Sequence, residues 1–462
     1  MSAAQSTAAQ NAQDPLDADV PALPRLLADI PEEGPMSLRE HLELRGELPR
    51  FERRRREEGP LIATIERAGL TGRGGAGFPT AAKMRAVAHA RGRAIVVVNI
   101  AEGEPASMKD RTLAQALPHV VLDGAELAAE AVGADEVIVC VCESASASVG
   151  GVAAALEERA ARSRSRPRAQ LVTVPATYVA GQESALVNFL DGGPAFPTFA
   201  PPRPFEAGVR RRPTLVSNAE TLAHLALIAR HGSAWFRELG TPSEPGSALV
   251  TLSGPVTRPG VYEIECGASL RSLIEAAGGT TARIRGALIG GYAGTWIAGE
   301  LVGGIALSRE HLAPHGATLG AGVVLLLSEH ACPVAETARA ARWLAEESSR
   351  QCGPCVHGLD AIASTIEQIA VGETGQRRVL ADLGSVASLV RRRGACGHPD
   401  GAVGFVLSAV EAFASDFTDH ARHGRCDACL PPGELPLPEH VRVYRAGERE
   451  DLGVRRLARP RR

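Results

Sequence analysis

Lysine and asparagine are nearly absent from this chain of 462 residues, which carries 50 basic residues. Its lysines and asparagines are Lys83, Lys109, Asn11, Asn99, Asn188 and Asn218. Because arginine serves almost wherever a cation is needed, a retained lysine is expected where a planar guanidinium does not fit or does not work. Both lysines are therefore candidate functional residues.

An excess of positive charge is also lacking. The formal net charge is -3, which excludes a strongly basic nucleic-acid binder, and no basic block indicates a membrane-surface patch. No apolar run reaches the ~18 residues of a membrane span, since the nearest, residues 286–307, is rich in glycine and interrupted by Glu300. The N-terminus has neither a basic n-region nor an apolar h-region. We therefore expect a cytoplasmic protein with no direct membrane insertion.

Paired disulfides are not expected, because the chain has an odd number of cysteines and no export signal. The nine cysteines are Cys140, Cys142, Cys266, Cys332, Cys352, Cys355, Cys396, Cys426 and Cys429. Five of them fall in the last quarter of the chain. This crowding predicts that some are metal ligands.

Short apolar runs alternate with helical patterns between residues 59 and 240, which predicts a Rossmann-like α/β domain. The strand-like runs are 94–99, 136–142 and 169–176, and the helical patterns are 118–133 and 150–164.

The rest of the chain differs in pattern. Residues 246–330 contain a strand–turn–strand–helix pattern that predicts a small β-grasp module, and i, i+3, i+4 apolar spacing predicts a helical bundle over 333–425. A mobile tail followed by a charged helix is expected over 1–58, and an extended extension rich in proline and arginine over 426–462. The fold class is therefore multidomain α/β with a C-terminal helical bundle.

A glycine-rich loop, Gly-Arg-Gly-Gly-Ala-Gly-Phe-Pro-Thr, occupies residues 72–80. Gly72, Gly74 and Gly77 form a Gly-x-Gly-x-x-Gly pattern, and glycines let backbone amides approach a phosphate closely. The pattern alone is weak, because no strand precedes it and a flexible surface loop would explain it about equally well. Lys83, six residues after Gly77, favours a phosphate cradle.

Polar residues follow the predicted strand that ends at Asn99. Glu102 and Glu104 stand in a Gly/Pro turn there, and the ends of α/β strands are where ligands bind. Two acids repel phosphate, so they are expected to meet sugar hydroxyls or a ring edge, unless this is an ordinary acidic turn. Two further polar segments, 178–188 and 212–221, are also explained as helix caps when taken singly.

Together these four segments resemble the NADH-binding flavoprotein subunit of respiratory complex I. They equally resemble the related diaphorase subunits of NAD-linked hydrogenases and formate dehydrogenases. The resemblance runs from about Gly69 to Ser415, and the glycine loop carries it most specifically. It implies an FMN- and NADH-binding α/β domain, a soluble-ligand-binding β-grasp module, and a helical bundle that holds a [4Fe–4S] cluster.

Site residues are carried over by position. The implied FMN contacts are Gly72, Gly74, Lys83, Asn99, Glu102, Tyr178, Gly181, Glu183, Ser217, Asn218 and Thr221. The implied NADH contacts are Gly75, Phe78, Lys83, Glu104 and Glu183, and Glu104 and Glu183 are the expected catalytic carboxylates. The implied reaction is hydride transfer from the nicotinamide to FMN, which then releases electrons one at a time.

Outside the cysteine motif, four positions depart from the family pattern. Ala101 replaces an aspartate, Gln182 replaces a glutamate, Ala86 replaces an aromatic residue, and Arg203 replaces a phenylalanine, with Phe205 two residues away. FMN binding is therefore better preserved than NADH binding. Arg203 either stacks on adenine through a cation–π contact or marks a different electron donor.

The family holds its cluster with Cys-x2-Cys-x2-Cys-x40-Cys. Cys352, Cys355 and Cys396 match the last three positions, whereas Ser349 stands at the first. A four-cysteine cluster needs four thiolates. We favour an iron–sulfur cluster whose fourth ligand is Ser349, water or another residue, and His357 and His398 flank the cysteines as capping residues or substitute ligands.

Three other interpretations remain open. Cys426 or Cys429 completes the cluster, or the pairs Cys352/Cys355 and Cys426/Cys429 hold a structural zinc, or no metal binds. A thioredoxin-like dithiol at Cys-Gly-Pro-Cys is disfavoured because a helical pattern precedes it. The remaining cysteines are expected to be buried structural thiols: Cys140, Cys142, Cys266 and Cys332.

We therefore predict an NADH dehydrogenase-type oxidoreductase. It would pass electrons from NAD(P)H through FMN and an iron–sulfur cluster to a ferredoxin, a thioredoxin-like iron–sulfur subunit or a quinone-reducing complex. Its location would be cytoplasmic or peripheral to a membrane complex, with no nucleic-acid partner. The alternative is a homologue inactive toward NADH, which keeps the fold for electron transfer or assembly and holds zinc or no cluster.

Overall fold

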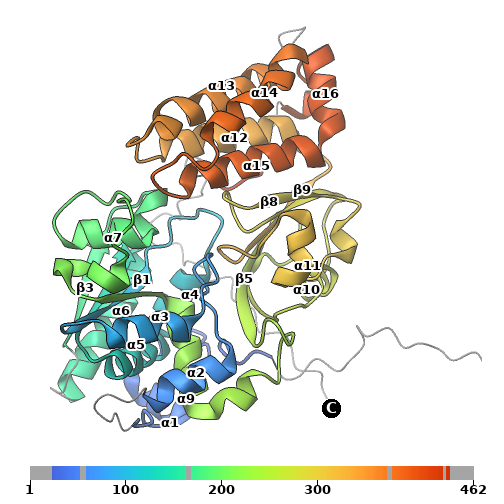
Figure 1. The fold of residues 1–462 in the computed structure, drawn as a ribbon. Helices are drawn as coiled ribbons and strands as arrows, with labels where there is room; N and C mark the ends of the chain where they lie inside the picture. The colour runs from blue at the N-terminus through green and yellow to red at the C-terminus, as the bar shows by residue number, and fades with distance from the viewer. Residues whose placement is uncertain (1–22, 52–58, 163–167, 372–376, 430–432, 438–462) are drawn as a thin grey trace, which may run out of the picture.

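The computed structural model describes residues 23–51, 59–162, 168–371, 377–429 and 433–437. The chain forms three parts: an α/β domain, a second sheet beside it, and a group of helices that lies across both (Figure 1). This is the predicted α/β architecture with a small second module and a helical C-terminal region.

The first sheet is parallel and has the strand order β3-β2-β1-β4. Its strands are β1 (Ala94–Ile100), β2 (Ala134–Cys142), β3 (Arg168–Val174) and β4 (Thr214–Asn218). Alternate β1 residues enter different cores: Val96 and Val98 pack in the larger one, and Ile95 and Val97 in the smaller one. Burial on both faces explains why this strand is a continuous apolar run.

Helices cover this sheet and connect its strands. They are α1 (Leu38–Arg45), α2 (Pro60–Ala68), α3 (Thr80–His89), α4 (Lys109–Ala116), α5 (Pro118–Val132), α6 (Ser146–Arg162), α7 (Glu183–Leu190), α8 (Pro204–Ala207) and α9 (Ala219–Phe236). Two short 3-10 segments, η1 (Tyr178–Gly181) and η2 (Val209–Arg211), lie between β3 and β4. Nearly all apolar side chains of the long helices α5 and α9 are buried.

The second sheet has the order β6-β5-β9-β7-β8 and mixes parallel and antiparallel pairs. Its strands are β5 (Ser247–Ser253), β6 (Gly260–Glu265), β7 (Ile284–Ile289), β8 (Thr295–Ala298) and β9 (Val323–Ser328). The intervening helical segments are α10 (Leu270–Ala276), η3 (Val302–Gly304), α11 (Arg309–Leu312) and η4 (Ala313–His315). One face packs on α10 and the other on the C-terminal helices, so β9 alternates between two cores.

The C-terminal helices pack on one another and on β8. They are α12 (Pro333–Glu346), the π-helix η5 (Pro354–Leu359), α13 (Asp360–Val371), α14 (Arg377–Val390), α15 (His398–Ala412), α16 (Ala414–His423) and the short η6 (Asp427–Cys429). Phe405 and Phe417 are fully buried in this core.

The expectation of a mobile N-terminal tail does not hold for residues 23–35, the part of that tail that the structure describes. Leu26, Leu27 and Ile30 are buried in the core of the α/β domain. The Leu26 and Leu27 amides donate to the Glu263 carboxylate on β6. The composition of this stretch did not indicate that Leu26, Leu27 and Ile30 are core residues.

The expected C-terminal extension is also partly packed. Leu435 and Leu437 are buried in the core of the helical part, and the Glu434 carboxylate accepts a hydrogen bond from the Ser328 amide (3.0 Å). The rest of the extension after residue 437 lies outside the described residues, as do residues 1–22.

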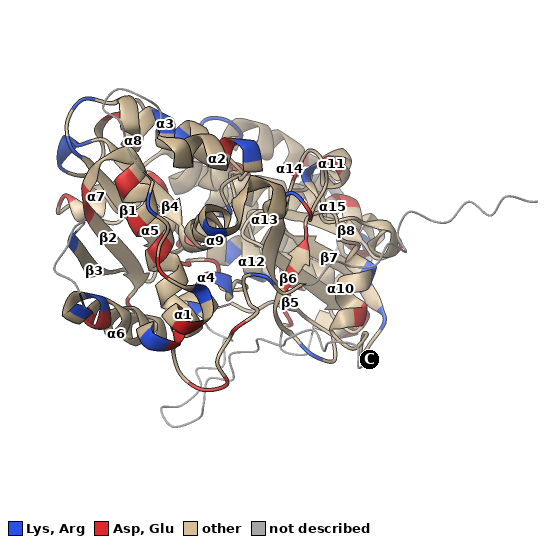
Figure 2. Cartoon of the chain, turned by 90° about the horizontal axis from the view of Figure 1, so that it is seen from below, with Lys and Arg blue, Asp and Glu red and all other residues tan. Residues whose placement is uncertain are grey.

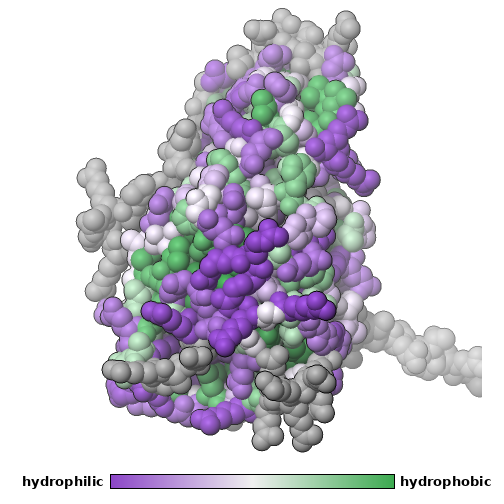
Figure 3. All heavy atoms as spheres, turned by 60° about the vertical axis from the view of Figure 1, so that its left-hand side comes forward, coloured by the Kyte–Doolittle hydropathy of each residue, from purple (hydrophilic) through white to green (hydrophobic). Residues whose placement is uncertain are grey.

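The surface carries charges of both signs. Basic and acidic residues are interspersed along α1, α2 and α6 (Figure 2). On the face in Figure 3, hydrophilic side chains gather across the centre and apolar side chains form small patches beside them. Among the described helices, none is by itself long and apolar enough to cross a membrane; α15 and α16 pass that test only as a pair, bent by 83°.

Candidate functional site

The first of two candidate sites lies at the carboxyl ends of β1 and β4 and is called the strand-end site below. These strands are neighbours although two strands separate them in sequence, so a topological switch point lies between them, which is where open α/β sheets bind ligands. Asn99 and Asn218 pair in register there. Asn99 Nδ2 donates to the Gly181 carbonyl (2.8 Å), and Asn218 Oδ1 caps α9 by accepting from the Glu220 amide (3.1 Å).

The glycine loop closes over this edge. The Gly72 amide donates to the Phe78 carbonyl (2.9 Å), and the Arg73 amide donates to Thr221 Oγ1 (2.8 Å). A Cβ at Gly74 would lie 3.3 Å from the Asn218 Cβ, and Gly75 has a φ of +107° that favours glycine. The tight approach at Gly74 and the positive φ of Gly75 both favour glycine in this loop, which fits a phosphate cradle.

Lys83 lies on α3 and reaches back to the same edge. Its Nζ donates to the Val216 carbonyl of β4 (3.0 Å) and forms an ion pair with Glu183 at the start of α7. Ser217 follows Val216 in β4 and is buried, and Gly181 packs so tightly that a Cβ there would lie 2.3 Å from the Ala101 carbonyl. Three segments distant in sequence thus converge on one cation.

Glu102 is a buried anchor for α4. Its carboxylate accepts hydrogen bonds from the amides of Asp110 (3.2 Å) and Arg111 (3.2 Å) and from the Ser107 hydroxyl (2.5 Å). An acceptor at the start of a helix satisfies amides that have no partner within the helix. In the described structure this carboxylate therefore holds the loop that follows β1.

Glu104 is held by the second module. Its Oε2 accepts from the Tyr292 amide (2.8 Å), and its Oε1 accepts from the Ala106 amide (3.3 Å). A Cβ at Gly291 would lie 2.4 Å from Oε2, so this contact requires glycine. Burial raises the pKa of Glu104 to about 7, although the two amides oppose the shift. A carboxyl with a pKa near 7 can hold or release a proton at working pH.

Lys109, the second lysine, is buried among carboxylates. Its Nζ lies 2.9 Å from Asp110 Oδ1, 3.0 Å from Glu220 Oε2 and 3.3 Å from Asn218 Oδ1. Burial alone would lower the pKa of Lys109, but the two carboxylates outweigh it and raise that pKa. Lys109 therefore neutralises the buried carboxylates of Asp110 and Glu220.

A cavity of about 270 Å³ lies between the glycine loop and the second module. Its lining includes Gly72, Gly75, Gly77, Glu220 and Gly320. Phe78, at the end of the loop, has 46% of its surface exposed. An exposed aromatic ring beside a glycine loop provides a stacking surface for a nucleotide base.

Of the departures from the family pattern, Gln182 has a structural role, whereas the Arg203 side chain is exposed and only its backbone makes the contact given below. The Gln182 side chain caps α7 by accepting from the amides of Ser184 (2.8 Å) and Ala185 (3.0 Å). Arg203 is exposed at the start of α8, where its amide donates to Glu206 Oε2 (2.8 Å).

Tyr178 joins the strand-end site to the helical part. Its ring packs edge-on against Trp343 of α12, with centroids 5.2 Å apart, and lies 5.4 Å from the ring of His398. Its amide donates to Glu347 Oε2 (2.9 Å). Because His398 is two residues from Cys396, the strand-end site and the cysteine site are contiguous.

Cys352, Cys355 and Cys396 lie together, as their motif predicts. The Sγ atoms of Cys352 and Cys355 are 3.7 Å apart, and Cys396 interacts electrostatically with Cys352. Burial alone would raise the pKa of Cys352, but the Ala395 and Cys355 amides outweigh it and lower that pKa. Such amides favour the thiolate that a metal needs, so these three thiols fit a cluster site.

The fourth position is less defined. Ser349 is half-buried in the segment between α12 and Cys352. His398 is buried and its Nε2 lies 2.8 Å from the Leu344 carbonyl. Ser349 as the fourth ligand remains a prediction.

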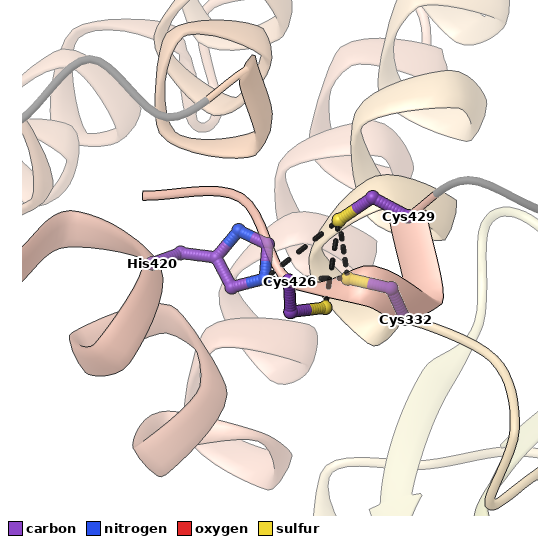
Figure 4. A group of neighbouring side chains, drawn as sticks. All are labelled: Cys332, His420, Cys426 and Cys429. Atoms are coloured by element: carbon purple, nitrogen blue, oxygen red, sulfur yellow. Dashed lines mark hydrogen bonds between the residues drawn. The ribbon is translucent and has the colours of Figure 1, made fainter. Parts of the chain in front are cut away.

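A second group of metal-ligand residues lies apart from these three. Cys332, His420, Cys426 and Cys429 place one ligand atom each within 4.8 Å of all the others (Figure 4). Cys332 is a buried free thiol, as expected, but it lies against His420, Cys426 and Cys429, a grouping that the sequence did not predict. Cys426 and Cys429 associate with Cys332 and His420, which argues against pairing them with Cys352 and Cys355. Cys140, Cys142 and Cys266 are buried free thiols, as expected.

Three family profiles match the chain. The description "Nuo51 FMN-binding domain" matches residues 65–227, "SLBB domain" matches 249–289, and "NADH-ubiquinone oxidoreductase-F iron-sulfur binding region" matches 335–420. The first profile covers the strand-end site, and the last covers Ser349 and the three clustered cysteines.

Relatives extend over most of the chain. A subunit of the NADH-quinone oxidoreductase of Rhizobium meliloti is 32% identical over 79% of this chain and 90% of its own length. NADP-reducing hydrogenase subunit HndC of Solidesulfovibrio fructosivorans is 27% identical over 80% of this chain and 77% of its own length. A chain of an NAD+-reducing [NiFe]-hydrogenase superposes with a TM-score of 0.74 at 33% identity; the match covers 78% of this chain but only 62% of that chain.

Proposed function

Because the chain belongs to the family of FMN-binding subunits of NADH-quinone oxidoreductase, we propose that it oxidises NAD(P)H at an FMN held at the strand ends. The electrons then pass through an iron–sulfur cluster to a partner redox protein. Bound FMN supplies a two-electron acceptor for hydride and a one-electron donor to the cluster.

The observation that carries this proposal is the contiguity of the two sites. The glycine loop, Lys83 and the paired asparagines surround the switch point, and Tyr178 leads from there to His398 beside Cys396. The segment that carries Cys396 therefore packs against the strand-end site, an arrangement that suits electron transfer between groups bound at the two sites.

The residues of this chain bind and orient the reactants. The loop amides and Lys83 would hold the phosphate, Asn99 and Asn218 mark the strand ends where the flavin would lie, and the exposed ring of Phe78 would stack on the nucleotide base. Glu183 positions the Lys83 ammonium, and Glu104 holds a proton close to the second module.

The cluster would be held by Cys352, Cys355 and Cys396, with Ser349 as the proposed fourth ligand. A serine oxygen in place of a thiolate is a harder ligand and makes for a more labile site. The π-helix that begins at Pro354 places Cys355 against Cys352, and such helices are frequent at functional sites.

Partners follow from the same argument. The relatives named above are subunits of larger oxidoreductases, which supports a role for this chain as a subunit that hands electrons to another protein. A ferredoxin-like or thioredoxin-like iron–sulfur subunit is the proposed acceptor, and a cytoplasmic location peripheral to a complex stays a prediction.

The test is an anaerobic visible spectrum of the purified protein before and after addition of NADH. Flavin bands and a broad iron–sulfur shoulder that both bleach are the expected result. Cys352→Ser should abolish the shoulder and leave the flavin bands, with Cys142→Ala as a matched thiol control. Flavin bands that ignore both NADH and NADPH would reject the proposal and favour the NADH-inactive homologue.

A further inference from the structure

Four ligand-type side chains meet where the second sheet, the helices and the C-terminal segment join. Cys332 follows β9 and caps α12, its Sγ accepting from the Ala335 amide (3.4 Å). His420 lies near the end of α16, and Cys426 and Cys429 follow in a Cys-x2-Cys turn. Figure 4 shows the three sulfurs and the His420 ring turned toward one another.

The distances suit one tetrahedral ion. Sγ of Cys429 lies 3.3 Å from that of Cys332 and 3.6 Å from that of Cys426, and His420 Nε2 lies 3.5 Å from Cys332 Sγ and 3.9 Å from Cys429 Sγ. Zinc–sulfur bonds of about 2.3 Å at tetrahedral angles place sulfurs roughly 3.8 Å apart. The four ligand atoms therefore stand close to the positions that zinc requires.

The types of ligand and the complete set of four favour a structural zinc ion over a catalytic metal ion. Three thiols and one imidazole make a Cys3His set, which is typical of structural zinc and leaves no open position for a substrate. His420 is buried and turns its Nε2 toward the sulfurs, while its Nδ1 is buried without a hydrogen-bond partner among the described residues.

The position of the group indicates what the ion would hold together. Residues 433–437, the next described segment after Cys429, pack on the core: the Glu434 and Leu435 amides donate to Glu336 of α12 (2.8 and 3.1 Å). Tyr292 Oη donates to the Pro436 carbonyl (3.0 Å), and the Tyr292 amide holds Glu104. The group thus fastens the segment that supports the second module's contact with the strand-end site.

We propose that Cys332, His420, Cys426 and Cys429 bind a structural zinc ion, separate from the iron–sulfur site, that clamps residues 433–437 onto α12 and the second sheet. The ion binds thiolates, so each cysteine that ligates it releases its proton to solvent and no electron is transferred. The proposal does not depend on the flavin chemistry.

Metal analysis of the anaerobically purified full-length protein tests this directly. We expect one zinc per chain in addition to the cluster iron. Cys426→Ser and Cys429→Ser should lose the zinc and keep the iron, whereas Cys352→Ser should lose the iron and keep the zinc. Cys142→Ala, a buried thiol outside both groups, should keep both.

Three results would overturn the proposal: wild-type protein without zinc after growth in zinc-sufficient medium, iron loss in Cys426→Ser and Cys429→Ser, or a Cys332–Cys429 disulfide found by mass spectrometry. Where a variant fails to fold, wild-type protein stripped of zinc and titrated with Co²⁺ decides. Intense thiolate-to-cobalt absorption that zinc abolishes supports the site, and its absence rejects it.

Discussion

At the scale of single residues, Lys83 shows why lysine is retained in an arginine-rich chain. Its compact ammonium meets both the Val216 carbonyl and Glu183 from one point, whereas a guanidinium is longer, planar and forked.

We therefore expect Lys83→Arg to weaken FMN or NADH binding about tenfold, the loss of roughly one charge-assisted hydrogen bond, although charge is conserved. Flavin-to-protein ratio and nucleotide titration measure this. The matched control is Arg85→Lys on the same helix, where Arg85 pairs with Glu66 on the surface. Unchanged flavin occupancy and nucleotide affinity in Lys83→Arg would contradict the prediction.

The buried carboxyl of Glu104 is expected to make the stability of the protein depend on pH. Its pKa is raised by burial to about 7, so the folded protein keeps a proton that the unfolded chain loses at lower pH. Its contribution to the free energy of unfolding is therefore complete below the unfolded pKa and lost as pH rises through about 7.

We expect wild-type stability relative to Glu104→Gln to fall by up to about 3 kcal/mol between pH 4.5 and pH 8. Urea unfolding of both proteins across that range measures it. A stability difference that is constant with pH would show that Glu104 titrates normally.

At the scale of elements, the loop after β7 joins the second sheet to two other parts of the chain. Gly291 and Tyr292 meet Glu104 through the backbone, and the Tyr292 hydroxyl meets Pro436. One buried residue thereby connects the strand-end site with the C-terminal segment.

Tyr292→Phe should cost about 1 kcal/mol, because it removes one buried hydrogen bond and leaves the Pro436 carbonyl without that donor. It should speed amide exchange in residues 433–437 while flavin binding persists. Tyr262→Phe, which removes a hydroxyl contact to Arg258 within the second module, is the control. Equal exchange in wild type and Tyr292→Phe would refute this role.

At the scale of the whole molecule, the segment before α1 fastens the α/β domain to the second sheet. Leu26 is fully buried in the α/β core, while the amides of Arg25, Leu26 and Leu27 all donate to Glu263 Oε2 on β6 (2.8, 2.7 and 3.0 Å).

Glu263→Ala should lower the free energy of unfolding by about 2–4 kcal/mol, because several buried donors lose a charged acceptor at once. Urea denaturation measures this against Glu275→Ala, an exposed acid on α10. A loss no larger than that of the control would mean that the segment is held by its apolar side chains alone.

Much of the architecture was readable from local pattern. The apolar run of β1, the alternation of strands with α5 and α6, and the i, i+3, i+4 spacing of the C-terminal helices all predicted elements that the structure contains. The packed stretches 23–35 and 433–437 were missed, because a few apolar residues among prolines carry no periodicity.

For the candidate sites too, some features were predictable from the sequence and others were not. By itself the sequence determined the glycine loop, the spacing of Cys352, Cys355 and Cys396, and the family, since these lie in short contiguous motifs whose backbone requirements are local. Only the tertiary structure decided that Tyr292 holds Glu104 and that Cys332 joins His420, Cys426 and Cys429. Those partners are far apart along the chain and meet because buried sheet and helix faces must pack together, a constraint that no local spacing records.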